Sequence, residues 1–453
     1  MKEQERATFG TKLGIILATA GSAVGLGNVW RFPYMTGENG GAVFILIYIG
    51  CVLVLGIPCM MSEFIIGRRA QANTARAYSA ISGGSLWKFV GYLGVLTGFL
   101  ITGYYAVVSG WCLEYIYGAI TGTLKGDSNY VQQHFLEFSQ NPWKPVIWMI
   151  LFFIITHWVI VRGVQRGIEK ASKLLMPTLF VLLLVIVVGS CTLPNAQADI
   201  EYLLRPDFSK LSGNVFLGAL GQAFYSLSIA MGCLCTYASY FSRETNLMRS
   251  AVQISIIDCL VAILSGLMIF PAAFSVGVSP DSGPALVFIT LPNVFNQAFS
   301  AVPLLGSAIA LLFYALLSLA ALTSLMSLHE VSTAFFHEEL KISRKRGALI
   351  VTVSCAIIGT FCSLSLGGYD GLQVAGQSLF DLFDFVTGQI FLPIGGFLTC
   401  LLLGWVVPSH VVKDEYTNGG SMKTRVFGIY LFAIRFVCPA GILLIFLHQF
   451  GVI

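Results

Sequence analysis

The chain has 453 residues, of which 56% are hydrophobic and only 11% are charged, with a formal net charge of +4. A soluble protein carries about 25% charged residues, so a fold of this size lacks the solvated groups needed to cover its surface. The same composition excludes intrinsic disorder, collagen and a small disulfide scaffold. Lipid must therefore surround much of the chain, which we interpret as an all-α polytopic membrane protein.

Eleven spanning helices are predicted from apolar runs near the ~20 residues that a bilayer requires. In chain order they cover 11–37, 41–68, 88–121, 145–162, 168–190, 213–240, 249–274, 303–337, 347–366, 378–407 and 424–449. Pro280–Pro303 is uncharged apart from Asp281 and is interrupted by prolines, which indicates a hairpin lying on the protein. The eleven cysteines lie almost wholly in apolar segments without a CxxC pattern. We expect them to be buried small side chains rather than disulfides or metal ligands.

The positive charges predict an orientation in the membrane. With a cytoplasmic N-terminus, 20 of the 26 Lys and Arg residues fall in inside segments, and the outside loops hold Lys125, Lys144, Arg205 and Lys210. This distribution is a strong positive-inside bias. We therefore expect a cell-membrane protein with its N-terminus in the cytoplasm. Because the helix count is odd, the C-terminus is expected outside.

The first predicted helix contains residues that a continuous membrane helix rarely has. Gly21, Gly25 and Gly27 lie within seven residues, and Asn28 and Arg31 follow them. Packing of small residues against a neighbouring helix would explain the glycines. It would not explain the asparagine and the arginine, which are costly at membrane depth. We therefore favour local unwinding of this helix.

The sixth predicted helix has a second irregular stretch, residues 221–232, rich in Gly and Ser. Serine hydroxyls bonding back to their own helix are the alternative explanation. Helices one and six occupy matching positions in a five-plus-five count, however, which indicates an inverted repeat with a site at the membrane midplane. The repeats would be 11–190 and 213–407, followed by an eleventh helix at 424–449, in one domain spanning 1–453. Free N–H groups and carbonyls there would suit a carboxylated substrate beside a small cation.

At these residues the sequence closely resembles the neurotransmitter:sodium symporter family, in its branch of bacterial amino-acid transporters with a leucine-transporter-like fold. The resemblance covers essentially the whole chain. It is carried by five motifs: Tyr104-Tyr105, Gly25–Pro33 (GLGNVWRFP), Thr236–Tyr240 (TYASY), Ala320–Ser324 (AALTS) and Asp381–Phe385 (DLFDF). It implies a symporter with unwound first and sixth helices that moves by alternating access.

The resemblance also implies a substrate site between the unwound segments and helices three and eight. Its amides, carbonyls, hydroxyls and side-chain pocket would come from Ser22, Ala23, Leu26, Gly27, Ile101, Tyr105, Tyr225, Ser226, Ser228, Met231, Ser324 and Leu328. For Ile101, Met231 and Leu328, plain packing is the alternative. In monoamine-transporting relatives an Asp occupies the position of Gly25. We therefore expect a substrate here that brings its own carboxylate.

Two sodium ions are implied as co-transported cargo. The first site would use Ala23, Asn28, Ser226 and Asp258, and the second would use Gly21, Val24, Ala320, Thr323 and Ser324. For Thr323 and Ser324, bonding back to their own helix is the alternative. Chloride is not expected, because Asp258 can supply a fixed negative charge beside the first site. A protonated Asp258 bonded to a neighbour is the alternative.

The family pattern further implies gates on both sides of the site. Outside, Arg31 would pair with Asp384. Inside, Arg6 and Phe9 would close against Glu338, with Tyr240 nearby, although Arg6 can equally be an ordinary cytoplasmic cation. Gly167 and Pro177, at the start of helix five, would let that helix unwind, and a simple proline kink is the alternative.

We interpret the protein as a bacterial sodium-coupled symporter that imports neutral, hydrophobic or aromatic L-amino acids. Its partners would be that substrate and membrane lipid, with no nucleic acid. A different small zwitterionic amino compound is an alternative substrate. An intramembrane aspartyl enzyme using Asp258, Asp381 or Asp384, or a substrate sensor on the same fold, are alternative functions. No GxGD, HExxH or GxSxG motif supports an enzyme.

Overall fold

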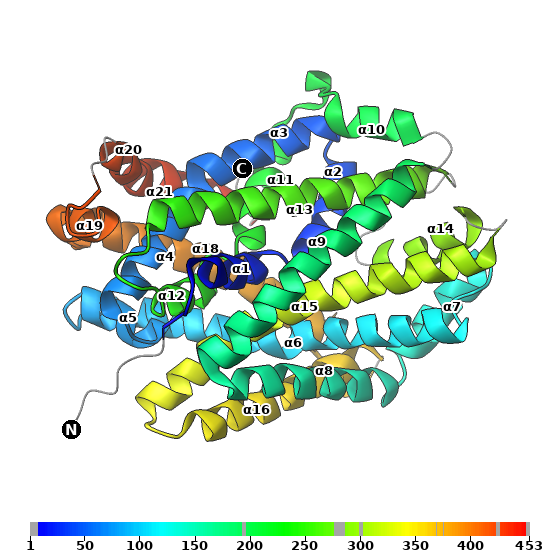
Figure 1. The fold of residues 1–453 in the computed structure, drawn as a ribbon, viewed down its shortest axis with the longest axis horizontal. Coiled ribbons are helices and arrows are strands. Elements are labelled where there is room, and N and C mark those ends of the chain that lie inside the picture. The colour runs from blue at the N-terminus through cyan, green and yellow to red at the C-terminus, as the bar shows by residue number, and fades with distance from the viewer. Residues whose placement is uncertain are drawn as a thin grey trace.

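The computed structural model describes residues 8–192, 196–275, 286–298, 302–367, 369–374, 376–422 and 426–449. Nearly all of them are helical. The two long helices α6 (Lys88–Thr121) and α15 (Pro303–Glu339) lie side by side along the longest axis of the molecule (Figure 1). A short antiparallel pair, β1 (Gln373–Val374) and β2 (Gln377–Ser378), lies beside α17 (Leu379–Phe385).

Nine helical stretches of the described chain are long and apolar enough to cross a membrane, and a bent pair formed by Lys12–Ala23 and Gly27–Glu38 would be a tenth. The nine are Ala42–Ala70, Lys88–Thr121, Lys144–Val161, Val164–Cys191, Leu247–Pro271, Leu304–Glu339, Arg344–Leu366, Leu379–Val406 and Phe427–His448. The predicted sixth span consists of two shorter helices, α11 (Gly213–Ser226) and α12 (Cys233–Ala238). Each of the eleven predicted spans therefore coincides with a helix or a broken helix, and the prediction of a polytopic all-α membrane protein is confirmed.

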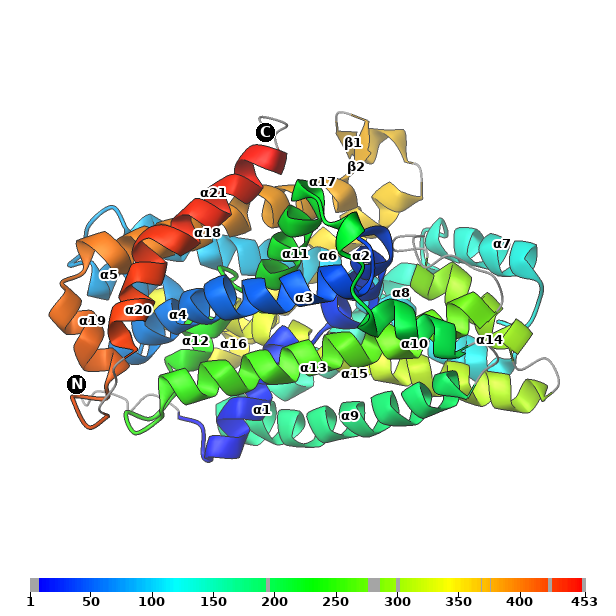
Figure 2. The same cartoon turned by 90° about the horizontal axis from the view of Figure 1, so that it is seen from above.

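The spans are assembled from helices and π-helical turns. They are α1 (Lys12–Ala23), η1 (Gly27–Arg31), α2 (Phe32–Glu38), α3 (Ala42–Cys51), η2 (Val52–Gly56), α4 (Ile57–Ala70), α8 (Lys144–Val161), η3 (Val164–Glu169), α9 (Lys170–Cys191), α13 (Leu247–Ser275), α16 (Arg344–Leu366), η7 (Val386–Phe391), α18 (Leu392–Leu401), η8 (Leu402–Val406), α20 (Phe427–Phe432), η9 (Ala433–Val437) and α21 (Cys438–Gln449). In Figure 2, α21 lies alongside α18, so the end of the chain packs against the tenth span.

Four further helices lie in the connections, where the sequence analysis predicted no element. They are α5 (Thr74–Ile81), α7 (Ser128–Ser139), α10 (Ala196–Leu204) and α19 (Ser409–Tyr416), and the chain also has short 3₁₀ turns at η4 (Phe208–Lys210) and η6 (Asp370–Leu372). Two of the helices begin at side-chain caps. Asn73 accepts a hydrogen bond from the Arg76 amide and Asp127 accepts one from the Tyr130 amide. Such caps satisfy the free amides of a first turn, and the hydropathy criterion used for spans does not detect them.

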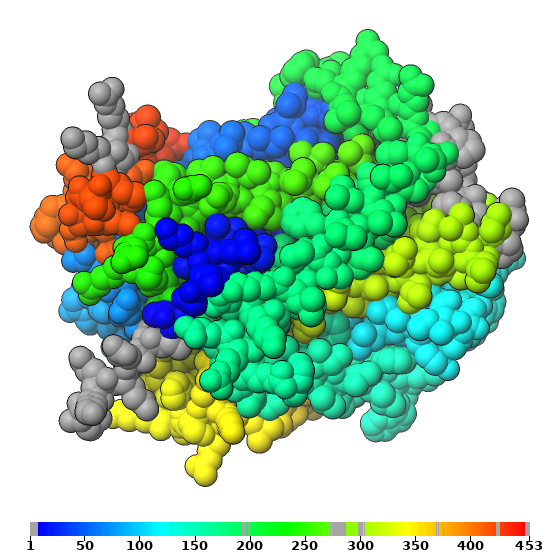
Figure 3. All heavy atoms as spheres, in the orientation of Figure 1, coloured from blue at the N-terminus to red at the C-terminus, as the bar shows by residue number. Residues whose placement is uncertain are grey.

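The predicted interruption of the first span is present. Thr11 caps the start of α1, where its side chain accepts a hydrogen bond from the Gly14 amide. The helix ends at Ala23, Val24 is extended (φ −72°, ψ 105°), and the axes on the two sides of the break differ by 54°. In Figure 3 the beginning of α1 forms a small surface patch between α9 and α13. The first span is therefore two half-helices joined inside the protein.

The sixth span is interrupted in a similar way. The helix α11 ends at Ser226, and α12 begins after Gly232, which has a positive φ of 75°. Between them Ser228 (φ 54°) and Ala230 (φ 66°) also occupy the left-handed region, which is unusual for residues with a side chain. Serine back-bonding within a continuous helix is therefore not the conformation of this segment, and the expected unwinding is confirmed.

The segment predicted as a hairpin at Pro280–Pro303 is helical where the structure describes it. It contains the π-turn η5 (Leu286–Thr290) and the helix α14 (Leu291–Ala298), while residues 280–285 and 299–301 lie outside the described chain. Val287, Phe288 and Val294 are almost completely buried. Pro292 belongs to the first turn of α14, where a missing N–H costs nothing. Here this proline sits at the start of a helix rather than breaking the backbone.

The helices α4 and α12 pack in backbone contact at Gly67. A Cβ atom added at Gly67 would lie 2.1 Å from the carbonyl oxygen of Cys235. This contact fixes α12, on the inner side of the sixth-span break, against the second span. Only a glycine allows the two helices to approach this closely, because the neighbouring atom belongs to the backbone and cannot rotate away.

We expect Gly67→Ala to destabilise the protein by about 1–3 kcal/mol, the usual cost of forcing an extra methyl group into a packed interior. Gly50→Ala on the same spanning stretch is the matched control, because a Cβ at Gly50 meets nothing within 4 Å. The control gains helix propensity and should be neutral or slightly stabilising. Thermal unfolding of both purified variants checks this, and equal melting temperatures would contradict the proposed contact.

Candidate functional site

The breaks in the first and sixth spans meet at a small cavity of about 30 Å³. Its walls are formed by Ser22, Ala23, Gly25, Gly27, Ile101, Tyr105, Tyr225, Ser226, Ser228, Met231, Ser324 and Leu328. These are the residues predicted to form the substrate site, except that Leu26 is absent from the wall and Gly25 is added. Leu26 lines a larger outer cavity instead. The structure thus brings together eleven of the twelve predicted residues from four separate spans.

Polar groups of two kinds lie at the cavity. The Leu26 amide donates a hydrogen bond to the hydroxyl of Tyr105, a wall residue (3.2 Å). The hydroxyl of Ser228, also a wall residue, donates to the carbonyl of Ser22 (2.9 Å). Donor groups suit a carboxylate, and carbonyls suit an ammonium group. The cavity therefore has both kinds of group that a zwitterion needs.

No side chain fits at the glycines of the first-span break. A Cβ at Gly25 would lie 2.4 Å from the Ser324 hydroxyl oxygen and 3.1 Å from the Tyr105 hydroxyl. A Cβ at Gly27 would lie 2.9 Å from the ring of Tyr225. The aromatic and hydroxyl groups therefore approach the backbone directly at these two positions.

Three of the residues predicted for the first sodium site form one buried hydrogen-bonded cluster. The Asn28 side-chain amide donates to Ser226 Oγ (3.0 Å) and to Asp258 Oδ1 (2.7 Å). The Ser226 hydroxyl lies 2.9 Å from both carboxylate oxygens. Asn28 and Asp258 are completely buried. Asn28 Oδ1 accepts a hydrogen bond from the Gly25 amide (3.1 Å), so the side-chain amide must turn before its oxygen can face an ion in this cluster.

Tyr48, on α3, completes the cluster and was missed by sequence reasoning. Its hydroxyl donates to Asp258 Oδ2 (2.8 Å) and lies 3.3 Å from Ser226 Oγ. The residue is completely buried. In the sequence Tyr48 is one aromatic residue in an apolar helix. The only feature that indicates a polar partner is its hydroxyl group, which needs a hydrogen bond when it is buried.

The oxygens predicted for the second sodium site also gather in one place. The Ser324 hydroxyl lies 3.5 Å from the carbonyl of Gly21 and 3.3 Å from that of Val24. The Thr323 hydroxyl lies 3.5 Å from the Val24 carbonyl, but closer to carbonyls of its own helix, at 2.9 Å from Ala320 and 3.2 Å from Leu319. Both the predicted cluster and the alternative of back-bonding are therefore present for Thr323. An all-oxygen set of this kind is what a hard cation prefers.

The outer cavity, of about 470 Å³, lies above the inner one and is lined by Arg31 and Asp384 among other residues. The expected ion pair between these two residues is not formed in this structure. Arg31 instead donates to the side-chain oxygen of Gln222 (3.1 Å) and lies over the ring of Tyr225, 4.6 Å from its centroid. Asp384 accepts a hydrogen bond from the hydroxyl of Tyr104 (3.1 Å). Each of the two charged groups therefore has neutral partners in place of the other.

At the inner end, Phe9 is buried among aromatic side chains, as expected for a gate. Its ring lies 5.8 Å from that of Tyr237 and 6.1 Å from that of Tyr240, and its amide donates to the Tyr240 carbonyl. Glu338 accepts hydrogen bonds from the backbone and side chain of Asn73 (2.8 and 3.1 Å). Arg6 lies outside the described residues, so the predicted contact between Arg6 and Glu338 stays a prediction.

The start of the fifth span is tied to the residues before α1. Glu169, which is almost completely buried, accepts hydrogen bonds from the Gly10 amide (2.7 Å) and the Thr11 hydroxyl (2.8 Å). Lys173 lies 2.6 Å from the same carboxylate. Gly167 belongs to the π-turn η3, and a Cβ there would lie 2.1 Å from the Val159 carbonyl. Pro177 follows within α9.

Two other buried carboxylates near the breaks were not identified from the sequence. Glu63 on α4 accepts a hydrogen bond from the amide of Ala230 (2.6 Å), inside the unwound part of the sixth span. Glu330 on α15 accepts a hydrogen bond from the Tyr240 hydroxyl (2.7 Å) and pairs with Arg344 (2.5 Å). A carboxylic acid within an apolar helix is costly unless it has a partner. The presence of an acid in an apolar segment was therefore the sequence signal that could have identified both residues.

A central site between two broken helices, with charged residues on both sides of it, defines the class of secondary transporters with a midplane binding site. A model of the "Sodium:neurotransmitter symporter family" matches residues 6–141 and 127–453. The chain therefore belongs to the sodium:neurotransmitter symporter family. Its members are sodium-dependent transporters and not enzymes, so the alternative of an intramembrane aspartyl enzyme is excluded.

Relatives from distant organisms match over nearly the whole chain. An "uncharacterized sodium-dependent transporter" of Bacillus subtilis is 36% identical over 455 residues. The match covers 100% of this chain and 100% of the relative. Another from Methanocaldococcus jannaschii is 32% identical, over 95% of this chain and 88% of the relative. The human "sodium- and chloride-dependent GABA transporter 2" is 25% identical, over 96% of this chain and 78% of the relative.

A solved structure, that of MhsT in complex with L-phenylalanine, is 40% identical. It superimposes with a TM-score of 0.88 over 98% of this chain and 99% of that one. The identity and the coverage together confirm the predicted leucine-transporter-like architecture.

We expect Tyr48→Phe to destabilise the protein more than Tyr115→Phe. Both hydroxyls are buried, but Tyr48 donates to a carboxylate and Tyr115 donates to the neutral carbonyl of Phe288 (2.7 Å). Hydrogen bonds to charged groups contribute about 1.5–3 kcal/mol, against roughly 0.5–1.5 kcal/mol for neutral pairs. Thermal unfolding and a sodium titration of the two variants check this. Equal losses of stability, with sodium affinity unchanged in both, would show that Tyr48 is not part of the cluster.

Proposed function

We propose that this protein imports neutral, hydrophobic or aromatic L-amino acids across the bacterial cell membrane, coupled to two sodium ions and without chloride. The main support is that the residues implied for the substrate line one inner cavity, beside the two oxygen clusters. The Leu26 amide and the Tyr105 hydroxyl would receive the carboxylate, and the Ser22 carbonyl and the Ser228 hydroxyl would face the ammonium group. Ile101 on α6, Met231 in the sixth-span break and Leu328 on α15 would contact the side chain of the substrate.

The apolar wall of the cavity supports a hydrophobic substrate. Ile101, Met231 and Leu328 contribute it, and all three are almost completely buried. Met231 is unbranched and flexible, which allows it to repack around ligands of different size. The complex of MhsT with L-phenylalanine, a similar protein, agrees with an aromatic substrate.

Alternating access would proceed by closing one side of the site while the other side opens. Arg31 and Asp384 would approach each other across the outer cavity when substrate is bound, with Tyr105 and Tyr225 closing over it. On the inner side, Phe9, Tyr240 and Glu338 would separate, together with Arg6. In this proposal the repeats are 11–190 and 213–407, and the N-terminus faces the cytoplasm.

The first test is uptake by purified protein in proteoliposomes. We expect concentrative accumulation of L-tryptophan or L-leucine that requires an inward sodium gradient. Tryptamine, which lacks the carboxylate, should neither be accumulated nor compete, because Gly25 has no side chain that could supply a carboxylate in its place. Sodium-dependent binding of tryptamine as tight as that of tryptophan would contradict the assigned orientation of the substrate.

The second test concerns the size of the pocket. Met231→Phe replaces a flexible side chain by a rigid and larger one, so we expect affinity for tryptophan to fall by about tenfold more than affinity for leucine, a difference of roughly 1.4 kcal/mol. Competition binding in saturating sodium measures the ratio, with leucine as the internal control. Equal losses for both ligands would remove Met231 from the substrate pocket.

The charge balance of the site supports independence from chloride. Two sodium ions and a zwitterion bring a net +2 into a buried site, which is costly unless a fixed negative charge lies nearby. Asp258 is buried within the first oxygen cluster and can supply this charge. The human relative is named as chloride-dependent, whereas the names of the bacterial and archaeal relatives mention sodium alone.

We therefore expect uptake to need sodium but to be unchanged when gluconate replaces chloride. Asp258→Asn should weaken sodium affinity by more than about tenfold, because it removes a buried charge that faces the ion. Chloride should partly restore this variant. Asp381→Asn is the matched control, since that carboxylate lies at an exposed position and accepts a hydrogen bond from Ser378. Loss of most wild-type activity in gluconate would show that Asp258 is not the compensating charge.

A further inference from the structure

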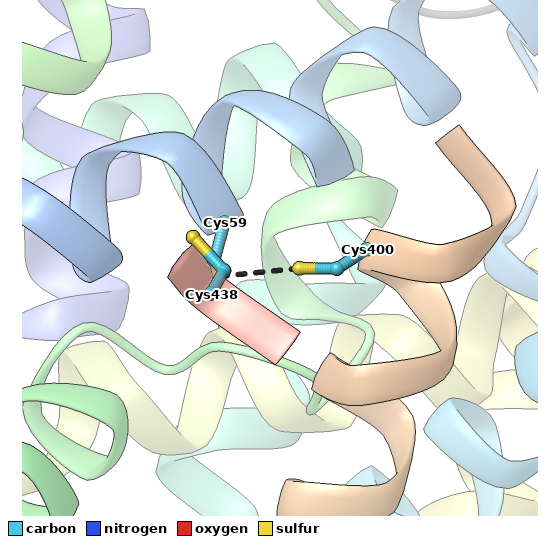
Figure 4. Close-up of side chains that lie close together, drawn as sticks. All are labelled: Cys59, Cys400 and Cys438. Carbon is cyan, nitrogen blue, oxygen red and sulfur yellow. Dashed lines mark hydrogen bonds between the residues drawn. The ribbon is translucent and has the colours of Figure 1, made fainter. Parts of the chain in front are cut away.

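Three cysteines that are far apart in the sequence meet inside the protein. Cys59 lies on α4, Cys400 on α18 and Cys438 on α21, and their sulfur atoms all lie within 4.8 Å of one another (Figure 4). The shortest separation, 3.5 Å, joins the Sγ atoms of Cys59 and Cys400. All three side chains are buried and none is in a disulfide. The spacing along the sequence gave no sign of this cluster, because each thiol comes from a different span.

The separation of the sulfurs fits coordination of one ion. A thiolate lies about 2.3 Å from a bound transition metal, so three sulfurs around one ion in a plane lie roughly 4 Å apart. The cluster therefore needs only small side-chain rotations to close on an ion. Within the described chain, no other group of three or more His, Cys, Asp or Glu side chains meets the same distance criterion.

The chemistry of the ligands selects the kind of ion. Thiol and thiolate ligands prefer soft ions such as Cu(I), whereas sodium prefers oxygen, so this cluster is distinct from the two oxygen clusters described above. Zn(II) prefers four ligands in a tetrahedron, whereas this cluster offers three sulfurs. The cysteines bind a metal as thiolates, so each sulfur that ligates the ion releases its proton. We propose that Cys59, Cys400 and Cys438 form a binding site for a soft thiophilic cation, with Cu(I) as the best match.

The position of the cluster connects it to the broken sixth span. Cys59 and Glu63 are four residues apart and so lie on the same face of α4. Glu63 holds the amide of Ala230 in the unwound segment. Helix α18 touches the same segment, because a Cβ at Gly395 would lie 3.1 Å from the Cβ of Ala230. A metal that fastens α4 to α18 and α21 would join the helices that hold this segment and should slow uptake.

The binding site is tested by anaerobic titration of the purified, full-length protein with Cu(I), in competition with the chromophoric chelator bicinchoninate. We expect one Cu(I) to be retained per chain, with sulfur neighbours at about 2.3 Å by X-ray absorption. Cys59→Ala, Cys400→Ala and Cys438→Ala should each lose at least about tenfold in affinity. Cys112→Ala and Cys355→Ala, which remove buried cysteines outside the cluster, should bind as the wild type does.

Failure of the wild type to retain Cu(I), or equal retention by the Cys400→Ala variant, would overturn the proposed site. Sodium-dependent binding of substrate in the absence of metal shows that each variant is folded. The link to transport has its own measurement, which is sodium-driven uptake before and after loading with Cu(I). We expect loading to slow the wild type and the Cys112→Ala variant but not Cys400→Ala, and chelation to reverse the effect. Unchanged uptake in the loaded wild type would overturn this link.

Discussion

The structure depends on how the backbone N–H and carbonyl groups find hydrogen-bond partners where two helices are interrupted inside an apolar protein. Every N–H and carbonyl that leaves its helix there needs another partner, because little water is available to replace it. Side chains from other parts of the chain supply these partners. Asn28 accepts from the Gly25 amide, Tyr105 accepts from the Leu26 amide, and Glu63 accepts from the Ala230 amide. The breaks are therefore fixed features that tertiary contacts hold in place.

The same requirement explains why binding groups collect at this point. Once the helices are interrupted, the free carbonyls of Gly21, Val24 and Ser22 lie next to hydroxyl groups of α15 and of the sixth span. In the proposed function, a cation or an ammonium group would take the place of these internal hydrogen bonds. Binding would then exchange contacts that the protein makes with itself for contacts to cargo. Asn28 of the first span and Ser226 of the sixth span bond to each other and both bond to Asp258. An acidic group therefore belongs to the hydrogen-bond network that joins the two broken spans.

Much of the fold could be predicted from sequence, because it depends on local signals, whereas the residues of the cavity wall were implied one by one by the resemblance to the symporter family. Runs of apolar residues identified the spans, and glycines beside Asn28 and Arg31 identified the first break. The predictions that failed or were missing depend on packing between distant segments. No local sequence pattern at Tyr48 or Glu63 predicts which residues they contact. Arg31 contacts Gln222 and Tyr225, although its predicted partner was Asp384. The three cysteines likewise become neighbours only through the tertiary arrangement of α4, α18 and α21.

The carboxylate of Glu169 has a consequence for how the segment before α1 and the start of the fifth span can move. It bonds to Gly10 and Thr11 before α1 and to Lys173 on α9, so two chain segments share one buried acid. Separating them would leave that acid short of donors, at a cost of about 1–3 kcal/mol for each unsatisfied buried group. An outward movement of the first half-helix would therefore also change the first turn of the fifth span, because both segments bond to the same carboxylate. Water that reached one of these segments would therefore loosen the other as well.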